Sequence, residues 1–167
     1  MRWDEFVKAA SELGERASER LRSDQVVLLG TLLPDGAPRI SGVECDLVDG
    51  ELMIGMIWRS MKALDLRRDP RFVLHTLVPD KAREADSQGD IKLYGSAAEV
   101  TDPARKRRYE DTIRARIDWA PAEPYHCFAF DIERAGMVRF ADDKRQVWSW
   151  RAGGAPRRRA IPELGPE

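Results

Sequence analysis

The sequence predicts a mainly β protein, a barrel of antiparallel strands with helices at its turns and ends. At least six short runs are rich in β-branched and aromatic residues, turn signals such as Pro34-Asp35-Gly36 separate them, and few stretches show helical spacing. The helices do not alternate with the strands, which argues against a doubly wound parallel sheet. The 167 residues suit one domain, which we take as residues 1–167.

The first predicted element is a helix. Apolar residues from Trp3 to Leu21 recur at steps of three and four, with charged residues between them. This spacing predicts one amphipathic helix over residues 3–22. Runs typical of β-strands follow, and Asp49-Gly50 is the strongest hairpin signal in the chain. We expect a meander of three antiparallel strands at 26–32, 38–47 and 51–57.

Two further helices are predicted from their capping residues. Ser60 can cap a short helix that ends at Asp69-Pro70. Asp102 and Pro103 are typical of a helix start, and this helix should run to about residue 117. The other predicted elements are strands at 71–78, 90–100, 126–133, 137–140 and 146–151, a polar loop at 79–89 and a surface tail at 153–167.

Charge and cysteine content narrow the function. The formal net charge is −1, so a nucleic acid is not expected as a partner. Cys45 and Cys127 lie far apart among apolar and aromatic neighbours, which predicts buried free thiols in a reducing compartment. The first residues lack the basic start and apolar run of a signal peptide, and no apolar stretch is long enough to span a membrane. We expect a cytoplasmic protein.

Common catalytic and nucleotide-binding motifs are missing from the chain. It contains neither the glycine-rich dinucleotide fingerprint nor a P-loop. Its two histidines and two cysteines do not have zinc-site spacing, so we expect no metal site.

Two motifs about twenty residues apart carry a family resemblance. The first runs from Gly30 to Ser41 and the second from Trp58 to Arg71. Together they resemble the pyridoxamine 5′-phosphate oxidase-like family, whose members have a flavin-binding split β-barrel. The resemblance covers residues 24–100 and is weaker over 125–150. It implies a homodimer that holds FMN or the deazaflavin coenzyme F-420 in a groove between subunits and acts as an oxidoreductase on a small molecule.

The resemblance places the cofactor phosphate at the start of the helix after residue 57. A helix N-terminus offers unpaired backbone N–H groups and partial positive charge. Ser60 would add a hydroxyl, and Arg59 and Lys62 would add positive charge. The plain structural alternative is a serine cap followed by a solvated lysine.

Arg39 and Ser41 are two residues apart, so they face the same side of a strand. In the family this strand runs beneath the flavin ring, where Arg39 would stabilise negative charge that rises when the ring accepts hydride. The alternative is a solvated strand arginine. The sequence departs from the vitamin-making oxidases at Glu44, Met56 and Met61, which argues against their reaction.

Two more cofactor contacts follow from the resemblance. Asp90, which shares a strand face with Lys92 and Tyr94, falls where a polar residue of the partner subunit reaches the ring. The alternative is a cross-strand salt bridge or core packing. Trp148 falls where the family often has a cofactor-side tryptophan, and the alternative is a core or interface residue.

The histidines leave a second function open. His75 and His126 lie in apolar strands, where a packed core residue is the usual interpretation. The family also includes split barrels that bind haem, so either histidine could be an axial ligand if it faced the groove. The alternative to a flavin oxidoreductase is therefore a non-enzymatic flavin or haem carrier.

The position of the basic residues helps to predict which of the two flavins binds. The run Arg105–Arg108 sits beside acidic residues and is interpreted as a solvated helix face. Arg59, Arg67 and Arg68 flank the predicted phosphate site, and Arg157–Arg159 are either a solvated tail or a clamp for an anionic cofactor tail. The deazaflavin carries such a tail, and the richness in Arg, Ala and Gly is typical of actinobacteria, where it is common. The sequence therefore leans slightly towards F-420.

Overall fold

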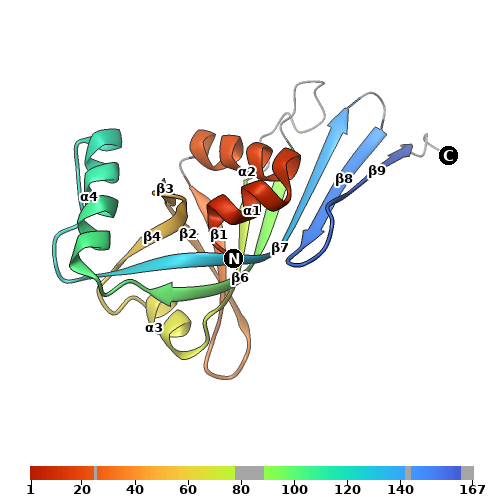
Figure 1. The fold of residues 1–167 in the computed structure, drawn as a ribbon. Coiled ribbons are helices and arrows are strands. Elements are labelled where there is room, and N and C mark those ends of the chain that lie inside the picture. Colours follow the sequence, from red (N-terminus) through yellow and green to blue (C-terminus); the bar gives the residue numbers. More distant parts are fainter. Residues whose placement is uncertain (25, 78–88, 142–143, 163–167) are drawn as a thin grey trace.

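The computed structural model describes residues 1–24, 26–77, 89–141 and 144–162. Within these residues, strands dominate and form one antiparallel sheet, with four helices around it (Figure 1). The helices are α1 (Trp3–Ala9), α2 (Ser11–Ser23), α3 (Met61–Arg68) and α4 (Pro103–Ile117). The strands are β1 (Val27–Leu32), β2 (Pro38–Val43), β3 (Asp46–Val48), β4 (Glu51–Ile57), β5 (Arg71–Thr76), β6 (Asp90–Glu99), β7 (Tyr125–Ala141), β8 (Lys144–Arg151) and β9 (Arg157–Pro162).

The order of the strands explains why the barrel is split. The sheet runs β2-β1-β5-β6-β7-β4-β3, so β2 and β3 lie at its two edges although they follow each other in the chain. The chain crosses between these edges through Glu44 and Cys45 without a hydrogen-bonded ladder. The predicted meander is therefore correct only in part, because its two hairpins form, β1 with β2 and β3 with β4, but β4 pairs with β3 and β7 and not with β2. The predicted strand 38–47 is divided for the same reason.

The long strand β7 connects the two halves of the molecule. It pairs with β6 along most of its length, with β4 at its first half and with β8 at its second. The sequence predicted two strands here, at 126–133 and 137–140. The structure has one strand with a bulge, where Tyr94 pairs with Arg134 but the next residue, Gly95, pairs with Ile132. Gly95 is required there because a Cβ would collide with the carbonyl of Asp131.

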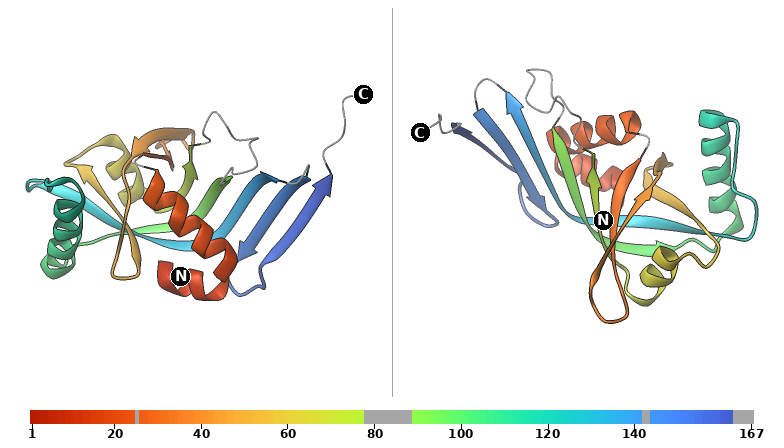
Figure 2. Two further views of the ribbon diagram at one scale, coloured as in Figure 1. Left: turned by 90° about the horizontal axis from the view of Figure 1, so that it is seen from above. Right: turned by 180° about the vertical axis from the view of Figure 1, so that it is seen from behind.

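The predicted helix over 3–22 is two helices. Ala10 leaves the helical region, with φ −140° and ψ 61°, and α2 folds back against α1. Gly14 permits this close approach, since a Cβ on it would lie 2.7 Å from the Cα of Val7. Trp3, Phe6 and Leu13 on the two helices are buried in the main core, so α1 and α2 cover one face of the sheet (Figure 2).

The C-terminal segment is more ordered than the predicted tail. Residues up to Pro162 form β9, which pairs with β8 and is exposed along its whole length. Figures 1 and 2 show this hairpin and α4 at opposite ends of the molecule. The predicted loop 79–89 lies outside the described residues except for Gly89. The described part of the chain contains no helix with the length and apolar character needed to cross a membrane.

Candidate functional site

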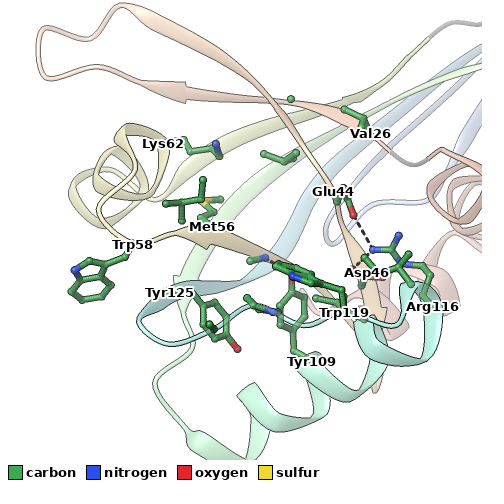
Figure 3. Close-up of a pocket in the computed structure, with 18 of the residues that line it drawn as sticks. Val26, Glu44, Asp46, Met56, Trp58, Lys62, Tyr109, Arg116, Trp119 and Tyr125 are labelled. Carbon is green, nitrogen blue, oxygen red and sulfur yellow. Dashed lines mark hydrogen bonds and ion pairs between the residues drawn. The ribbon is translucent and has the colours of Figure 1, made fainter.

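A cavity of about 770 Å³ lies between α4 and the end of the sheet formed by β2, β3 and β4 (Figure 3). Most of its lining is apolar or aromatic. Tyr109 from α4 and Tyr125 from β7 form one wall, and Trp119 follows the end of α4. The phenol oxygen of Tyr109 accepts a hydrogen bond of 2.6 Å from the backbone N–H of Gly55. This contact requires a glycine in β4, because a Cβ would lie 2.5 Å from that oxygen.

The charged groups of the cavity are distributed unevenly. At one end Arg116 forms ion pairs with Glu44, at 3.1 Å, and with Asp46, at 2.9 Å. At the other end lies the half-buried Lys62, in the first turn of α3 (Figure 3). Among the described residues no acidic side chain pairs with Lys62. One end of the cavity therefore holds one arginine paired with two carboxylates, a formal charge of −1, and the other end holds a cation without an ion-pair partner in the described structure.

The start of α3 adds hydrogen-bond donors beside Lys62. Ser60 is the N-cap residue, but its hydroxyl does not cap the helix, and Oγ is buried without a partner in the described structure. Without a cap, the first backbone N–H groups of α3 have no acceptor of their own. Arg59, in the left-handed conformation with φ 56°, is exposed beside this turn and does not line the cavity. Ser60 does not line the cavity either, so of the three predicted phosphate-site residues only Lys62 does.

Arg39 has a structural partner that the sequence interpretation did not foresee. Its Nε donates to Oδ2 of the buried Asp65 at 2.7 Å, and Asp65 also accepts from Thr31 at 2.9 Å and from Arg68 at 3.2 Å. Burial alone would raise the pKa of Asp65, but these hydrogen bonds outweigh it and hold the pKa below its usual value. Arg39 joins β2 to α3 and lies outside the cavity lining.

Ser41 does not line the cavity either. It lies on the same side of β2 as Arg39 and is half-buried, whereas the next residues along the chain, Gly42 and Val43, do line the cavity. The predicted strand therefore borders the site, but through residues just beyond the predicted pair.

Asp90 and Trp148 lie away from the cavity within one chain. Asp90 carries the cross-strand contact considered as its alternative, with Oδ2 3.2 Å from His75 Nε2 and 3.7 Å from Lys92 Nζ. Trp148 is buried on β8 against α2, between the guanidinium groups of Arg16 and Arg158. Only a second subunit could bring either residue to the cavity.

The histidines also lie outside the cavity lining. His126 is buried, with Nδ1 bonded to Glu99 and its ring stacked on Trp58 at 4.4 Å between centroids. Its Nε2 is buried and has no partner in the described structure. His75 Nδ1 contacts the carbonyl of Thr76.

Neither the thiols nor the cavity phenols are activated. Cys127 is buried as predicted, but Cys45 is only half-buried. Burial raises the pKa of each thiol to about 12, so both are protonated at neutral pH. Burial also raises the pKa of Tyr109 and that of Tyr125, whose hydroxyl donates to Glu110. In the described residues no group of three or more His, Cys, Asp and Glu side chains could hold a metal ion.

An exposed apolar rim surrounds the mouth of the cavity. It consists of Val26, Ile57, Trp58, Ile117 and Trp119, of which Ile57 is 78% exposed and Trp119 57%. The sequence interpretation missed this rim, together with Tyr109, Tyr125 and Arg116. One signal was available, because Trp119 stands in the turn-forming segment 119–124 directly after a predicted helix end.

Comparison of the sequence with family models gives no match, and a search of curated proteins gives none at a significant level. Comparison with solved structures does give matches. A putative pyridoxamine 5′-phosphate oxidase from Listeria innocua is 18% identical, with a TM-score of 0.61 over 74% of this chain and 95% of its own. A NimC/NimA family protein from Clostridium acetobutylicum is 15% identical, with a TM-score of 0.62 over 87% and 99%.

A haem-binding protein from Mycobacterium smegmatis is also similar. It is 20% identical, with a TM-score of 0.64 over 82% of this chain and 57% of its own. The predicted resemblance is confirmed at the level of the fold, since this chain has the split β-barrel that pyridoxamine 5′-phosphate oxidase-like proteins share. The same fold occurs in a putative pyridoxamine 5′-phosphate oxidase and in a haem-binding protein, so it does not choose between their functions.

Proposed function

We propose that the chain binds a flavin-type cofactor in the cavity, with the cofactor phosphate at the start of α3, and acts as an oxidoreductase. The observation that carries the proposal is Lys62, a cation without an ion-pair partner in the described structure, which lines a mostly apolar cavity of about 770 Å³. A half-buried ammonium group is costly unless an anion accompanies it. A phosphate on Lys62 would supply that anion.

The neighbouring residues fit a phosphate. The N-terminus of α3, which no side chain caps in the described structure, presents backbone N–H donors and partial positive charge beside Lys62, and the hydroxyl of Ser60 is buried just behind the cavity lining. Tyr109, Tyr125 and Trp119 offer flat apolar surfaces, which suit an aromatic ring system. When bound, the flavin ring would supply hydride-transfer chemistry, which fits a site whose two phenols are both protonated.

The arrangement of the arginines favours FMN over F-420. The deazaflavin tail would need a basic track leading away from Lys62, but Arg67 pairs with Glu99 at 3.1 Å and Arg68 contacts Asp65. Arg157–Arg159 lie on β9, at the far end of the molecule from the cavity. Within one described chain only Arg59 extends the positive charge of the site. We therefore place FMN first and F-420 second, in contrast to the slight preference drawn from the sequence.

We also propose a homodimer in which the partner covers the apolar rim. Leaving Ile57 and the two tryptophans in water is unfavourable, and a large apolar patch at a cavity mouth is typical of an interaction surface. A second copy seated there would close the cavity and exclude water from it.

Titration of the purified chain with FMN and with F-420, followed by flavin fluorescence, tests the cofactor proposal. Lys62→Ala should weaken binding about tenfold to a hundredfold, since it removes a charge-assisted contact of about 1.5–3 kcal/mol. Lys62→Arg should retain most of the affinity. Lys8→Ala, on the exposed side of α1, is the control and should change nothing. Unchanged affinity in folded Lys62→Ala would refute the phosphate site.

The dependence of affinity on salt concentration distinguishes the two flavins. FMN affinity should depend weakly on salt because one phosphate meets one lysine, whereas the longer anionic tail of F-420 should give a steeper loss as salt rises. Tighter binding of F-420 at low salt, lost at high salt, would reverse our order.

Haem is the second candidate, and one observation favours it. His126 presents an unpartnered Nε2 while Glu99 holds Nδ1, as in histidines that bind metals through one nitrogen. The stacked Trp58 covers this ring, so haem binding would require Trp58 to move. Titration with hemin decides the question. The flavin proposal expects no sharp Soret band. A band that His126→Ala abolishes and His75→Ala leaves unchanged would favour a haem carrier.

A further inference from the structure

We propose that the outer face of β7, β8 and β9 binds single-stranded nucleic acid. This surface lies at the opposite end of the molecule from the cofactor cavity and does not depend on it (Figure 1). Residues 144–162 contain six basic residues and no acidic one, although the whole chain has a net charge of −1. The near-neutral total conceals this local excess.

The inner face of the hairpin is anchored to the body. Trp148 and Trp150 on β8 are buried, and the ring of Trp150 packs 4.9 Å from that of Phe6 in α1. Because side chains alternate along a strand, the residues between these tryptophans point away from the helices. Val147, Ser149 and Arg151 therefore lie on the outer face, which no helix of the described structure covers.

Arginines follow one another along this outer face. Cross-strand partners point to the same side of a sheet, so the pairing of the strands locates them. Four successive rows each contain at least one arginine: Arg134 with Arg151, Ser149 with Arg157, Val147 with Arg159, and Phe140 with Arg145. Rows two residues apart are separated by about 6.8 Å along the strand, from a rise of about 3.4 Å per residue. This repeat is close to the reach of one nucleotide in an extended strand.

These five arginines are available for a ligand. All are exposed, and within the described structure none of their side chains forms an ion pair or a hydrogen bond. By contrast, Arg158 faces the helices and contacts Gln146 and Glu12. The guanidinium of Arg134 lies 5.3 Å from the ring centre of Tyr94 on β6.

The aromatic residues favour a single-stranded nucleic acid over other polyanions. Tyr94 and Phe140 are half-buried on the same face and border the arginine rows, and bases stack on such rings while cations hold the phosphates. A membrane surface would call for exposed apolar side chains at the hairpin tip, but the connection at 152–156 consists of Ala, Gly and Pro. A flat sheet face also lacks a projecting helix that could enter a duplex groove.

Fluorescence anisotropy of a labelled twelve-nucleotide poly-U strand tests the proposal on the full chain. The logarithm of the binding constant should fall with the logarithm of salt concentration with a slope of about −3.5, since about five phosphates are neutralised. The triple variant Arg145→Ala, Arg157→Ala, Arg159→Ala should bind about a hundredfold more weakly at 0.1 M salt and reduce the slope to about −1.4. FMN titration of the same variant should be unchanged.

The matched control removes three exposed cations elsewhere, as Arg22→Ala, Arg107→Ala, Arg114→Ala. It has the same net charge as the test variant and should bind poly-U as the wild type does. Several results would overturn the proposal. These are equal weakening by both triple variants, no binding by the wild type at low salt, binding only to vesicles that contain anionic phospholipid, or conversion of a dimer to monomers by the test variant.

Discussion

The arginines around α3 and those on the outer face of the β8–β9 hairpin differ in whether they form ion pairs. Arg39 and Arg68 converge on the fully buried carboxylate of Asp65, so their charges are part of the packing between β2, β1 and α3. On the outer face of the hairpin, arginines such as Arg157 and Arg159 have no ion-pair partner in the described structure. Arg39 and Arg68 therefore hold the fold together around α3, whereas the arginines on the outer face of the hairpin are free to meet a ligand.

The largest effect that separates the two ends should come from Asp65→Ala. It leaves Arg39, Arg68 and Thr31 without their shared acceptor, and breaking a buried ion pair costs about 3 kcal/mol or more. Urea unfolding should show this loss. Arg157→Ala should change the free energy of unfolding by less than about 0.5 kcal/mol. Comparable losses for the two variants would remove the contrast.

The second effect concerns the apolar rim. Ile57→Glu should weaken the proposed dimer at least tenfold, because burying an isoleucine contributes about 1.5–3 kcal/mol. Sedimentation over a range of protein concentrations measures the change. Ile161→Glu on β9 is the matched control at the hairpin end, and it should leave the dimer intact. Dissociation by Ile161→Glu and not by Ile57→Glu would move the interface to the hairpin.

A smaller effect on stability should distinguish the inner face of the β8–β9 hairpin, which packs on the helices, from its outer face. Arg158 lies 4.9 Å from the ring centre of Trp148, whereas Arg159 points to the outer face. Arg158→Ala should lower the free energy of unfolding by about 0.5–1 kcal/mol and alter tryptophan fluorescence. Arg159→Ala should do neither. Equal effects would mean that the inner and outer faces are not distinct.

The smallest expected effect is the change of the unfolding free energy with pH that the titration of Asp65 causes. Its pKa is lowered in the folded chain, so its contribution to stability is complete above the unfolded value of 3.8 and is lost as pH falls through the folded value. Asp65→Asn should therefore flatten the acid end of a plot of unfolding free energy against pH.

Local signals in the sequence located most elements correctly. Asp49 and Gly50 both have positive φ in the turn between β3 and β4, and Asp102 caps α4 through a hydrogen bond to the N–H of Ala104. Such signals depend only on neighbouring residues, so they can be interpreted without the fold. The order of the strands depends on distant partners, which is why the expected meander is correct only in part.

The candidate site was predictable to a similar degree. Lys62, which lines the cavity, was singled out because a helix start and a family motif coincide there. The partner of Arg39 was not, because Asp65 lies 26 residues away and one turn into a helix. The aromatic wall was missed for the same reason, as the packing of α4 brings Tyr109 to β4 and the pairing of β7 with β4 brings Tyr125 there.

The two edges of the split barrel meet across the cavity. Gly42 and Val43 come from the edge strand β2, and Asp46 comes from β3 at the other edge. A ligand bound between them would contact both edge strands, β2 and β3, which no ladder of hydrogen bonds joins in the described structure. It would favour the closed barrel by mass action, in proportion to the logarithm of its concentration. Amide hydrogen exchange should then slow at β2 and β3 while it stays unchanged in β8, at the far end of the sheet.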